Sequence, residues 1–187
     1  MAQFKSIPDF KMLNQYNDTI TRGDMYGKIW VIDFFFTSCP SICPEMTENL
    51  KQLSEAFIDE PRFGILSISI DPERDTPERM RSYAAKYEVE HPFWYFLTGD
   101  KAQIMELANQ GFNLYAAENP NAPGGFEHSG KFALFDDKVM MRSRYDNFGN
   151  PILFYDGVND PHTPEEVQYD VKILIEDVKQ LLKETDR

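Results

Sequence analysis

The stretch KIWVIDFFFTSCPSICP, residues Lys28–Pro44, decides how we expect this chain to fold. Its first part, up to Phe36, is a nearly continuous apolar and aromatic run, which is typical of a strand buried on both faces. The cysteine segment comes next, and from Glu45 to Phe57 apolar residues recur at helical spacing. This order places the cysteines at the carboxyl end of a strand, where open α/β sheets form their sites.

Outward from this stretch, strands and helices continue to alternate, and we predict one domain over residues 1–187. The start of the chain is expected to be irregular. Strands are predicted at 62–70 and 91–97, helices at 76–87 and 101–111, a loop at 118–125, hairpin strands at 131–135 and 139–144, and a final helix from near Pro164. This order predicts an α/β, thioredoxin-like fold, with a central, mostly parallel sheet, helices on both faces and a C-terminal antiparallel hairpin.

Composition limits the partners that we expect. The chain has 187 residues, of which 42% are apolar and 27% are charged, as in ordinary globular proteins. With 19 basic and 31 acidic residues its formal net charge is −12, so it repels phosphate backbones and we expect no nucleic-acid partner. No apolar run is long enough to cross a membrane, and the first residues lack the apolar core of a signal peptide. Either the protein is natively soluble in the cytoplasm, or a targeting or anchoring segment has been removed.

The chain has two cysteines, Cys39 and Cys43, which excludes a disulfide-stapled small fold and a zinc site made of cysteines alone. Pro44 suits the first position of the helix, so Cys43 begins it, and the helix dipole is expected to lower the pKa of its thiol. The spacing puts both sulfurs on one side, within reach of a disulfide bond, and the reduced pair could equally hold a soft metal. Redox chemistry, metal binding and a buried structural pair all remain open on the cysteines alone.

Three segments together resemble the SCO/SenC family. The first is Phe36–Pro44, FTSCPSICP, in which each cysteine is followed by proline; the second is Ile68–Pro77, ISIDPERDTP; the third is Glu127-His128-Ser129, just before a strand. The run Trp94–Gly99, WYFLTG, also matches, and the resemblance extends from about Ile7 to the final helix in matching order.

The resemblance implies a thioredoxin-like domain that binds one copper ion, as Cu(I) or Cu(II), through Cys39, Cys43 and His128. Family members serve in assembling the binuclear copper centre of cytochrome c oxidase, as copper donors, as thiol reductants, or both. The implied partner is a copper-accepting subunit of the oxidase or another copper protein. Family members are usually tethered to a membrane and face the bacterial periplasm or the mitochondrial intermembrane space. We therefore expect an extracytoplasmic location and an anchor that is absent from this chain.

A few residues lie outside this core of the resemblance. Asp71 ends the second strand, so it either orients the histidine ligand from beside the metal site or belongs to an ordinary Asp-Pro turn. His91 and His162 are expected to be surface or structural residues. Ser41 stands where the family often has an acid, and Asn147–Thr163 is longer than expected between the last strand and the last helix.

Two functions compete most closely. A copper metallochaperone requires His128, whereas a thiol–disulfide oxidoreductase without an essential metal role needs only Cys39 and Cys43 and a suitable reduction potential. A peroxiredoxin-like peroxidase would need an activating pocket around its cysteine, and a zinc hydrolase would need a general base, for which Asp71 is the candidate. Copper donation is not turnover, so thiol–disulfide reduction is the one enzymatic activity that we consider further.

Overall fold

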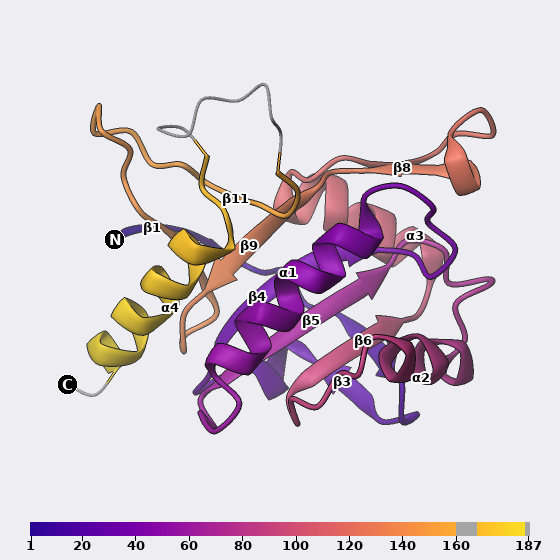
Figure 1. The fold of residues 1–187 in the computed structure, drawn as a ribbon, viewed down its shortest axis with the longest axis horizontal. Helices are drawn as coiled ribbons and strands as arrows, with labels where there is room; N and C mark the ends of the chain where they lie inside the picture. Colours follow the sequence, from indigo (N-terminus) through magenta and orange to yellow (C-terminus); the bar gives the residue numbers. More distant parts are fainter. Residues whose placement is uncertain (160–167, 186–187) are drawn as a thin grey trace.

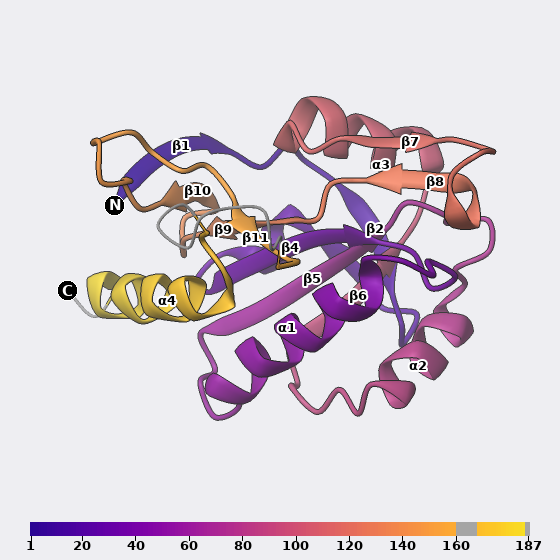
Figure 2. The same ribbon diagram turned by 45° about the horizontal axis from the view of Figure 1, so that its top comes forward.

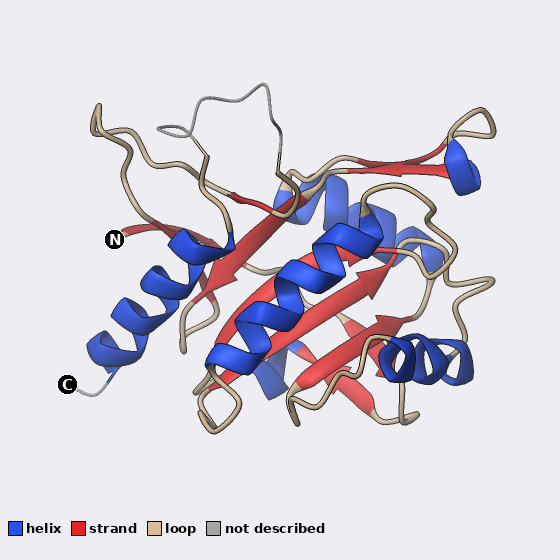
Figure 3. Ribbon diagram, in the orientation of Figure 1, coloured by secondary structure: helices blue, strands red, loops and turns tan. Residues whose placement is uncertain are grey.

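The computed structural model describes residues 1–159 and 168–185, and Figures 1 and 3 show a large sheet with helices packed against it. Across these residues the strand order is β1-β10-β9-β4-β5-β6-β2-β3, with β11 paired to β9 and a separate hairpin of β7 and β8. The strands are β1 Ala2–Ser6, β2 Lys11–Asn14, β3 Thr19–Thr21, β4 Ile29–Phe35, β5 Phe63–Ser69, β6 Trp94–Thr98, β7 Ala116–Glu118, β8 Phe126–His128, β9 Lys131–Phe135, β10 Met140–Ser143 and β11 Tyr155–Asp156. The helical segments are η1 Arg22–Met25, α1 Cys43–Ala56, α2 Pro77–Lys86, α3 Lys101–Glu106, η2 Leu107–Phe112, η3 Pro123–Gly125 and α4 Val171–Thr185.

β4 lies at the centre of the sheet and corresponds to the apolar run that precedes the cysteines. Each residue of β4 and of β5 is buried, because both strands lie between layers of helices. β4 pairs in parallel with β5, and β5 with β6, whereas β4 pairs antiparallel with β9. The predicted parallel arrangement is therefore found at the centre of the sheet, and the remaining strand pairs within the described residues are antiparallel.

Helices cover both faces of the sheet, as predicted. The ring of Phe35 lies 5.4 Å from that of Tyr83 on α2, while the ring of its neighbour Phe34 lies 5.4 Å from that of Phe112 on η2. Successive side chains of a strand point to opposite faces, so α2 and η2 lie on opposite sides. Figure 2 shows α1, α2 and α4 on one side of the sheet and α3 on the other. The hydrophobic core fills the two layers between the sheet and these helices.

The N-terminal residues form strands, so the predicted irregular start is wrong. β1 pairs with β10 at one edge of the sheet, and β2 pairs with β6 and β3 at the other. At the centre of the sheet, Gly64 on β5 packs against Trp30 on β4, whose indole N–H donates to the carbonyl of Met25 at 2.8 Å. A Cβ atom on Gly64 would overlap the indole ring, so this approach of β5 to Trp30 requires glycine.

The C-terminal hairpin of β9 and β10 is confirmed, and the chain continues to β11 and α4. Tyr155 on β11 donates its hydroxyl proton to Asp177 on α4 at 2.6 Å, and Arg144 donates to both oxygens of the same carboxylate. Helix α4 begins at Val171, later than predicted, and the expected start near Pro164 lies outside the described residues. Within residues 1–159 and 168–185, no helix combines the length and the apolar character that crossing a membrane requires.

Candidate metal centre

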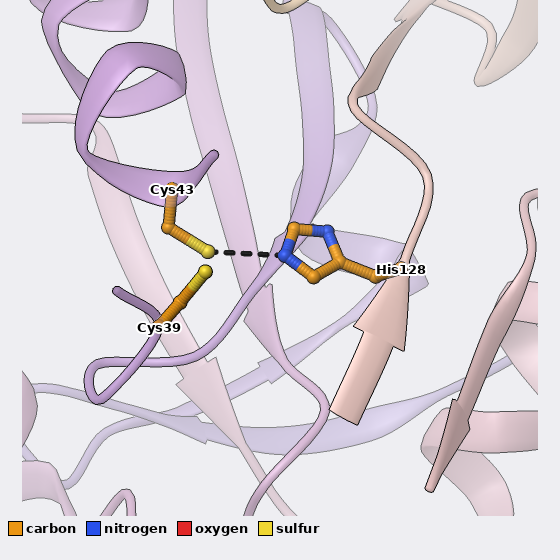
Figure 4. A group of neighbouring side chains, drawn as sticks. All are labelled: Cys39, Cys43 and His128. Atoms are coloured by element: carbon orange, nitrogen blue, oxygen red, sulfur yellow. Dashed lines mark hydrogen bonds between the residues drawn. The ribbon is translucent and has the colours of Figure 1, made fainter. Parts of the chain in front are cut away.

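Cys39 and Cys43 lie between the end of β4 and the first turn of α1, at the carboxyl edge of the parallel strands, as predicted. Both side chains are buried, and neither forms a disulfide bond. His128 is half-buried and reaches the cysteines from the end of β8 (Figure 4). Its Nε2 lies 3.0 Å from Cys43 Sγ, and the three potential ligand atoms all lie within 4.8 Å of one another. The structure therefore brings the three predicted ligands together.

Asp75, fully buried just before α2, holds the segment that leads to the cysteines. Its carboxylate accepts the backbone N–H of Thr37 at 3.0 Å and the Thr37 hydroxyl at 2.5 Å, and it also accepts the hydroxyl of Ser69 at 2.6 Å. Arg79 on α2 donates to the Thr37 hydroxyl at 2.8 Å. These bonds tie the end of β4 to the end of β5. Sequence reasoning assigned no role to Asp75, although its place inside the second family-like segment is a signal.

The hairpin that carries His128 packs against the aromatic ring of Phe36. Its strands β7 and β8 flank the predicted loop, and at its tip Gly124 has a φ of +81°. A Cβ atom there would come within 2.7 Å of the Phe36 ring, so glycine is needed both for the turn and for the approach. Arg74 donates to the Gly124 carbonyl at 3.1 Å, with its guanidinium 5.7 Å from the centre of the Phe126 ring. The ring of Phe36 also meets that of His128 edge-on at 5.8 Å.

The two thiols share a hydrogen bond that separates their acidities. This bond lowers the pKa of Cys39 to about 3, with further lowering by hydrogen bonds from His128 and Ser41. The same bond, burial and the charge of Cys39 raise the pKa of Cys43 far above its usual value. The prediction of an acidic Cys43 is therefore wrong, because burial and the neighbouring thiolate outweigh the helix dipole. Of the two thiols, Cys39 therefore has the lowered pKa and Cys43 the raised one.

Asp33 is a buried acidic residue near the site that sequence reasoning missed. It accepts the hydroxyl of Ser67 at 2.6 Å, and Ser67 Oγ in turn accepts the indole N–H of Trp94 at 3.0 Å. Burial raises the pKa of Asp33 to about 7, and the nearby His128 limits this rise. The charge of Asp33 also contributes to the raised pKa of Cys43. Its signal in the sequence is a single charged residue inside an otherwise apolar strand.

Arg74, and not His128, links Asp71 to the β7–β8 hairpin. Its carboxylate pairs with Arg74 Nε at 2.5 Å, its backbone N–H donates to Ser69 Oγ at 3.1 Å, and burial raises its pKa. Because Arg74 also binds the hairpin tip, Asp71 would act on His128 through Arg74. The predicted role of Asp71 beside the metal site stays a prediction.

The donor set of the site suits a soft metal ion. Two cysteine sulfurs and one imidazole nitrogen are ligands that favour Cu(I) or Zn²⁺ over Mg²⁺ or Ca²⁺. Among the other histidines, His91 is buried with Nε2 3.0 Å from the carbonyl oxygen of Phe57, which agrees with the structural role expected of it. His162 lies outside the described residues.

Comparison with known proteins finds a matching family model and several relatives. The SCO1/SenC family model matches residues 2–160. The SCO1 protein homologue of Bacillus subtilis (strain 168) is 32% identical over 138 residues, which cover 72% of this chain and 71% of that protein. A putative copper-binding protein of Stutzerimonas stutzeri is 27% identical over 141 residues, which cover 74% of this chain and 68% of that protein. The chain spans about half the length of several further curated relatives.

A solved structure agrees with the fold over almost the whole chain. The crystal structure of a SCO1/SenC family lipoprotein from Bacillus anthracis str. Ames has a TM-score of 0.76 and 27% sequence identity, and the match covers 95% of each chain. This likeness confirms the predicted thioredoxin-like α/β fold. Because the family model covers most of its length, and a relative above 30% identity covers more than two thirds of it, the chain belongs to the SCO1/SenC family.

Proposed function

We propose that this protein is a copper metallochaperone. It binds one copper ion through Cys39, Cys43 and His128 and delivers it to a copper-accepting subunit of cytochrome c oxidase or to another copper protein. One observation carries the proposal: Nε2 of His128 lies 3.0 Å from Cys43 Sγ, although the two residues are 85 positions apart. A redox dithiol does not need a histidine nitrogen at this point, whereas a three-ligand copper site does. The copper-binding description of the Stutzerimonas stutzeri relative supports the same reading.

The site combines two buried donors with one that is half-exposed, which suits a cargo that must leave again. Both thiols are buried in the loop and helix start, whereas His128 sits at the end of a hairpin. Two thiolates and an uncharged imidazole around Cu(I) leave a net charge of about −1. A partner that offers soft ligands of its own can then replace the protein ligands one at a time, beginning with the accessible imidazole.

We further propose an extracytoplasmic location, periplasmic in a bacterium, with the protein tethered to a membrane and residues 1–187 acting as one domain. The Bacillus anthracis relative is a lipoprotein, which supports a tethered protein outside the cytoplasm. Fractionation of cells that express the full-length protein would test this location, and recovery of the protein with the cytoplasmic fraction would contradict it.

Thiol–disulfide exchange is the second candidate function, and the divergent acidities of the two thiols favour it. In this reaction the Cys39 thiolate attacks a partner's disulfide, one partner sulfur leaves as a thiolate, and Cys43 then displaces the second. The cysteine pair loses two electrons and becomes a disulfide, and the partner gains two electrons and becomes a dithiol. The same two sulfurs serve both candidates, but His128 is required only by the first.

An anaerobic Cu(I) titration of the reduced protein against a competing chelator separates the two candidates. Wild type is expected to bind one equivalent, and His128→Ala and Cys43→Ser are each expected to weaken binding by at least about tenfold. Glu127→Gln is the matched control, because Glu127 is the exposed neighbour of His128 on β8 and contacts Asn119 on the same hairpin. If His128→Ala binds Cu(I) as tightly as wild type, the histidine is not a ligand and thiol–disulfide exchange becomes the better account.

A further inference from the structure

The site is built from two elements that are far apart in sequence, so further contacts must fix the distance between them. Cys43 opens α1, and His128 ends β8, ahead of the first residue of β9, Lys131. The pairing of β9 with β4 begins further along, where Ala133 faces Ile32. The loop between β8 and this paired region therefore needs its own contacts to hold the imidazole against the thiol.

One residue on the long segment after β10 connects these two elements directly. The backbone N–H of Gly157 donates to the carbonyl of Gly130, in the loop that follows His128, at 2.8 Å. The carbonyl of the same residue, Gly157, accepts the side-chain amide of Asn49 on α1 at 3.0 Å. Asn49 is buried, and it lies on the helix that begins with Cys43. A continuous hydrogen-bonded bridge thus runs from α1 through Gly157 to the histidine loop.

The bridge is tightly packed and leaves no room for a side chain at its centre. A Cβ atom on Gly157 would come within 2.9 Å of both the Gly130 carbonyl oxygen and the Phe132 ring. On the other side of the loop, a Cβ atom on Gly130 would meet Val158 at 3.2 Å and Ile42 at 3.6 Å. Because contacts below 3.0 Å are not tolerated, any residue other than glycine at 157 must push the loop away.

The segment that carries Gly157 is anchored on both sides of it. Before it, β11 pairs with β9, with Tyr155 facing Phe132. After it, the backbone N–H of Asn159 donates to the carboxylate of Glu45 in the first turn of α1 at 2.8 Å. Gly157 is therefore held between the sheet and α1 and can act as a fixed spacer between them.

The bridge reaches the imidazole through the peptide next to Gly130. The carbonyl oxygen of Ser129, which immediately precedes Gly130, lies 3.2 Å from Nδ1 of His128 and accepts a hydrogen bond from it when Nδ1 carries the proton. This bond leaves Nε2 free to face Cys43. We infer that Asn49 and Gly157 are positioning residues that set the orientation of His128 and its distance from Cys43. The inference rests on the proposed function for its consequence, since it makes the bridge a determinant of copper affinity.

The test begins with the reduced, copper-free protein. Side-chain ¹⁵N relaxation of labelled histidine reports how firmly the His128 ring is held. In Asn49→Ala, and in Asn49→Asp, which keeps the shape but cannot donate, the ring is expected to become more mobile than in wild type. Gly157→Ala is expected to shift the ring resonances by displacing the loop. Ser54→Ala is the matched control, because Ser54 is buried on α1 and, among the described residues, its hydroxyl donates to the carbonyl of Lys51 in the same helix.

Cu(I) titration of the same variants gives the second readout. Asn49→Asp is expected to weaken Cu(I) binding by about tenfold, less than His128→Ala, while Ser54→Ala binds as wild type does. If the ring of His128 is as rigid in Asn49→Asp and Asn49→Ala as in wild type, the bridge has no positioning role and the inference is overturned. If the ring loosens but His128→Ala leaves Cu(I) affinity unchanged, the bridge stands and the proposed copper function fails instead.

Discussion

Replacing the buried carboxyl of Asp33 with an amide is expected to change how the stability of the protein depends on pH. Burial raises the pKa of Asp33 to about 7 from its ordinary value of 3.8. Between these two values the folded chain holds a proton that the unfolded chain releases. Asparagine keeps the shape and the oxygen that accepts the Ser67 hydroxyl, but it has no proton to lose.

The size of the effect follows from the two pKa values. Because the folded state binds more protons than the unfolded state, the free energy of unfolding falls as the pH rises through this window. The shift is about three units at roughly 1.4 kcal/mol each, so ionisation of Asp33 costs about 4 kcal/mol once the pH is well above 7. Part of this cost is already present at pH 5, which leaves a loss of about 2.5 kcal/mol between pH 5 and pH 8.

Urea unfolding of the reduced, metal-free protein at pH 5 and pH 8 measures this loss. Wild type is expected to lose about 2.5 kcal/mol more than Asp33→Asn between the two pH values. The comparison cancels the contributions of other titrating groups, such as the buried His91, which both proteins share. Asp59→Asn, which changes an exposed carboxyl, should retain the wild-type dependence. Equal pH dependence in wild type and Asp33→Asn would show that Asp33 is ionised in the folded state and would refute the reasoning.

Three further predictions concern single residues. Brief alkylation of the reduced protein at pH 5 is expected to label Cys39 before Cys43, because the pKa of Cys39 is lowered to about 3; peptide mapping by mass spectrometry that found the reverse order would contradict this. Asp177→Ala is expected to lower the free energy of unfolding by about 3 kcal/mol in a urea titration, since it removes the buried carboxylate that joins α4 to β11; a loss below about 1 kcal/mol would count against that role. Gly64→Ala is expected to cost about 2 kcal/mol because the new methyl group meets the Trp30 ring, and an unchanged melting temperature would show that the ring can move aside.

The elements that sequence reasoning predicted well are those whose signals are local. The run that became β4 is apolar over its whole length, and α2 begins where a capping Thr76 precedes a proline; in the structure Thr76 does accept the N–H of Arg79. The three candidate ligands came from short motifs in a fixed order, and they meet in space. Patterns of this kind depend on neighbouring residues alone, so they can be read without knowledge of the fold.

What could not be predicted depends on partners far away in the chain. β7 and β8 are each three residues long, and they are recognised as strands because they pair with each other. The sequence alone does not distinguish such short strands from a loop. The acidity of Cys43 was assigned from its helix position, yet its pKa is raised by its hydrogen bond with Cys39, by burial and by the charge on Cys39. Asp33 was missed because its hydroxyl partner, Ser67, lies on another strand and the sequence shows it as no more than a charge in an apolar run.

The placement of the N-terminal strands has a consequence for the order in which the chain can fold. β1 pairs with β10, where Ala2 faces Ser143, and β2, although it also pairs with the neighbouring β3, joins the rest of the sheet through β6, where Leu13 faces Thr98. The pairing of β1 with β10 therefore joins residues about 140 positions apart, and the pairing of β2 with β6 joins residues about 85 positions apart. Pairings between such distant residues raise the contact order and slow folding. The rate-limiting event should be the addition of β1 and of the β2–β3 pair to the edges of the sheet, after the parallel centre around β4 has formed.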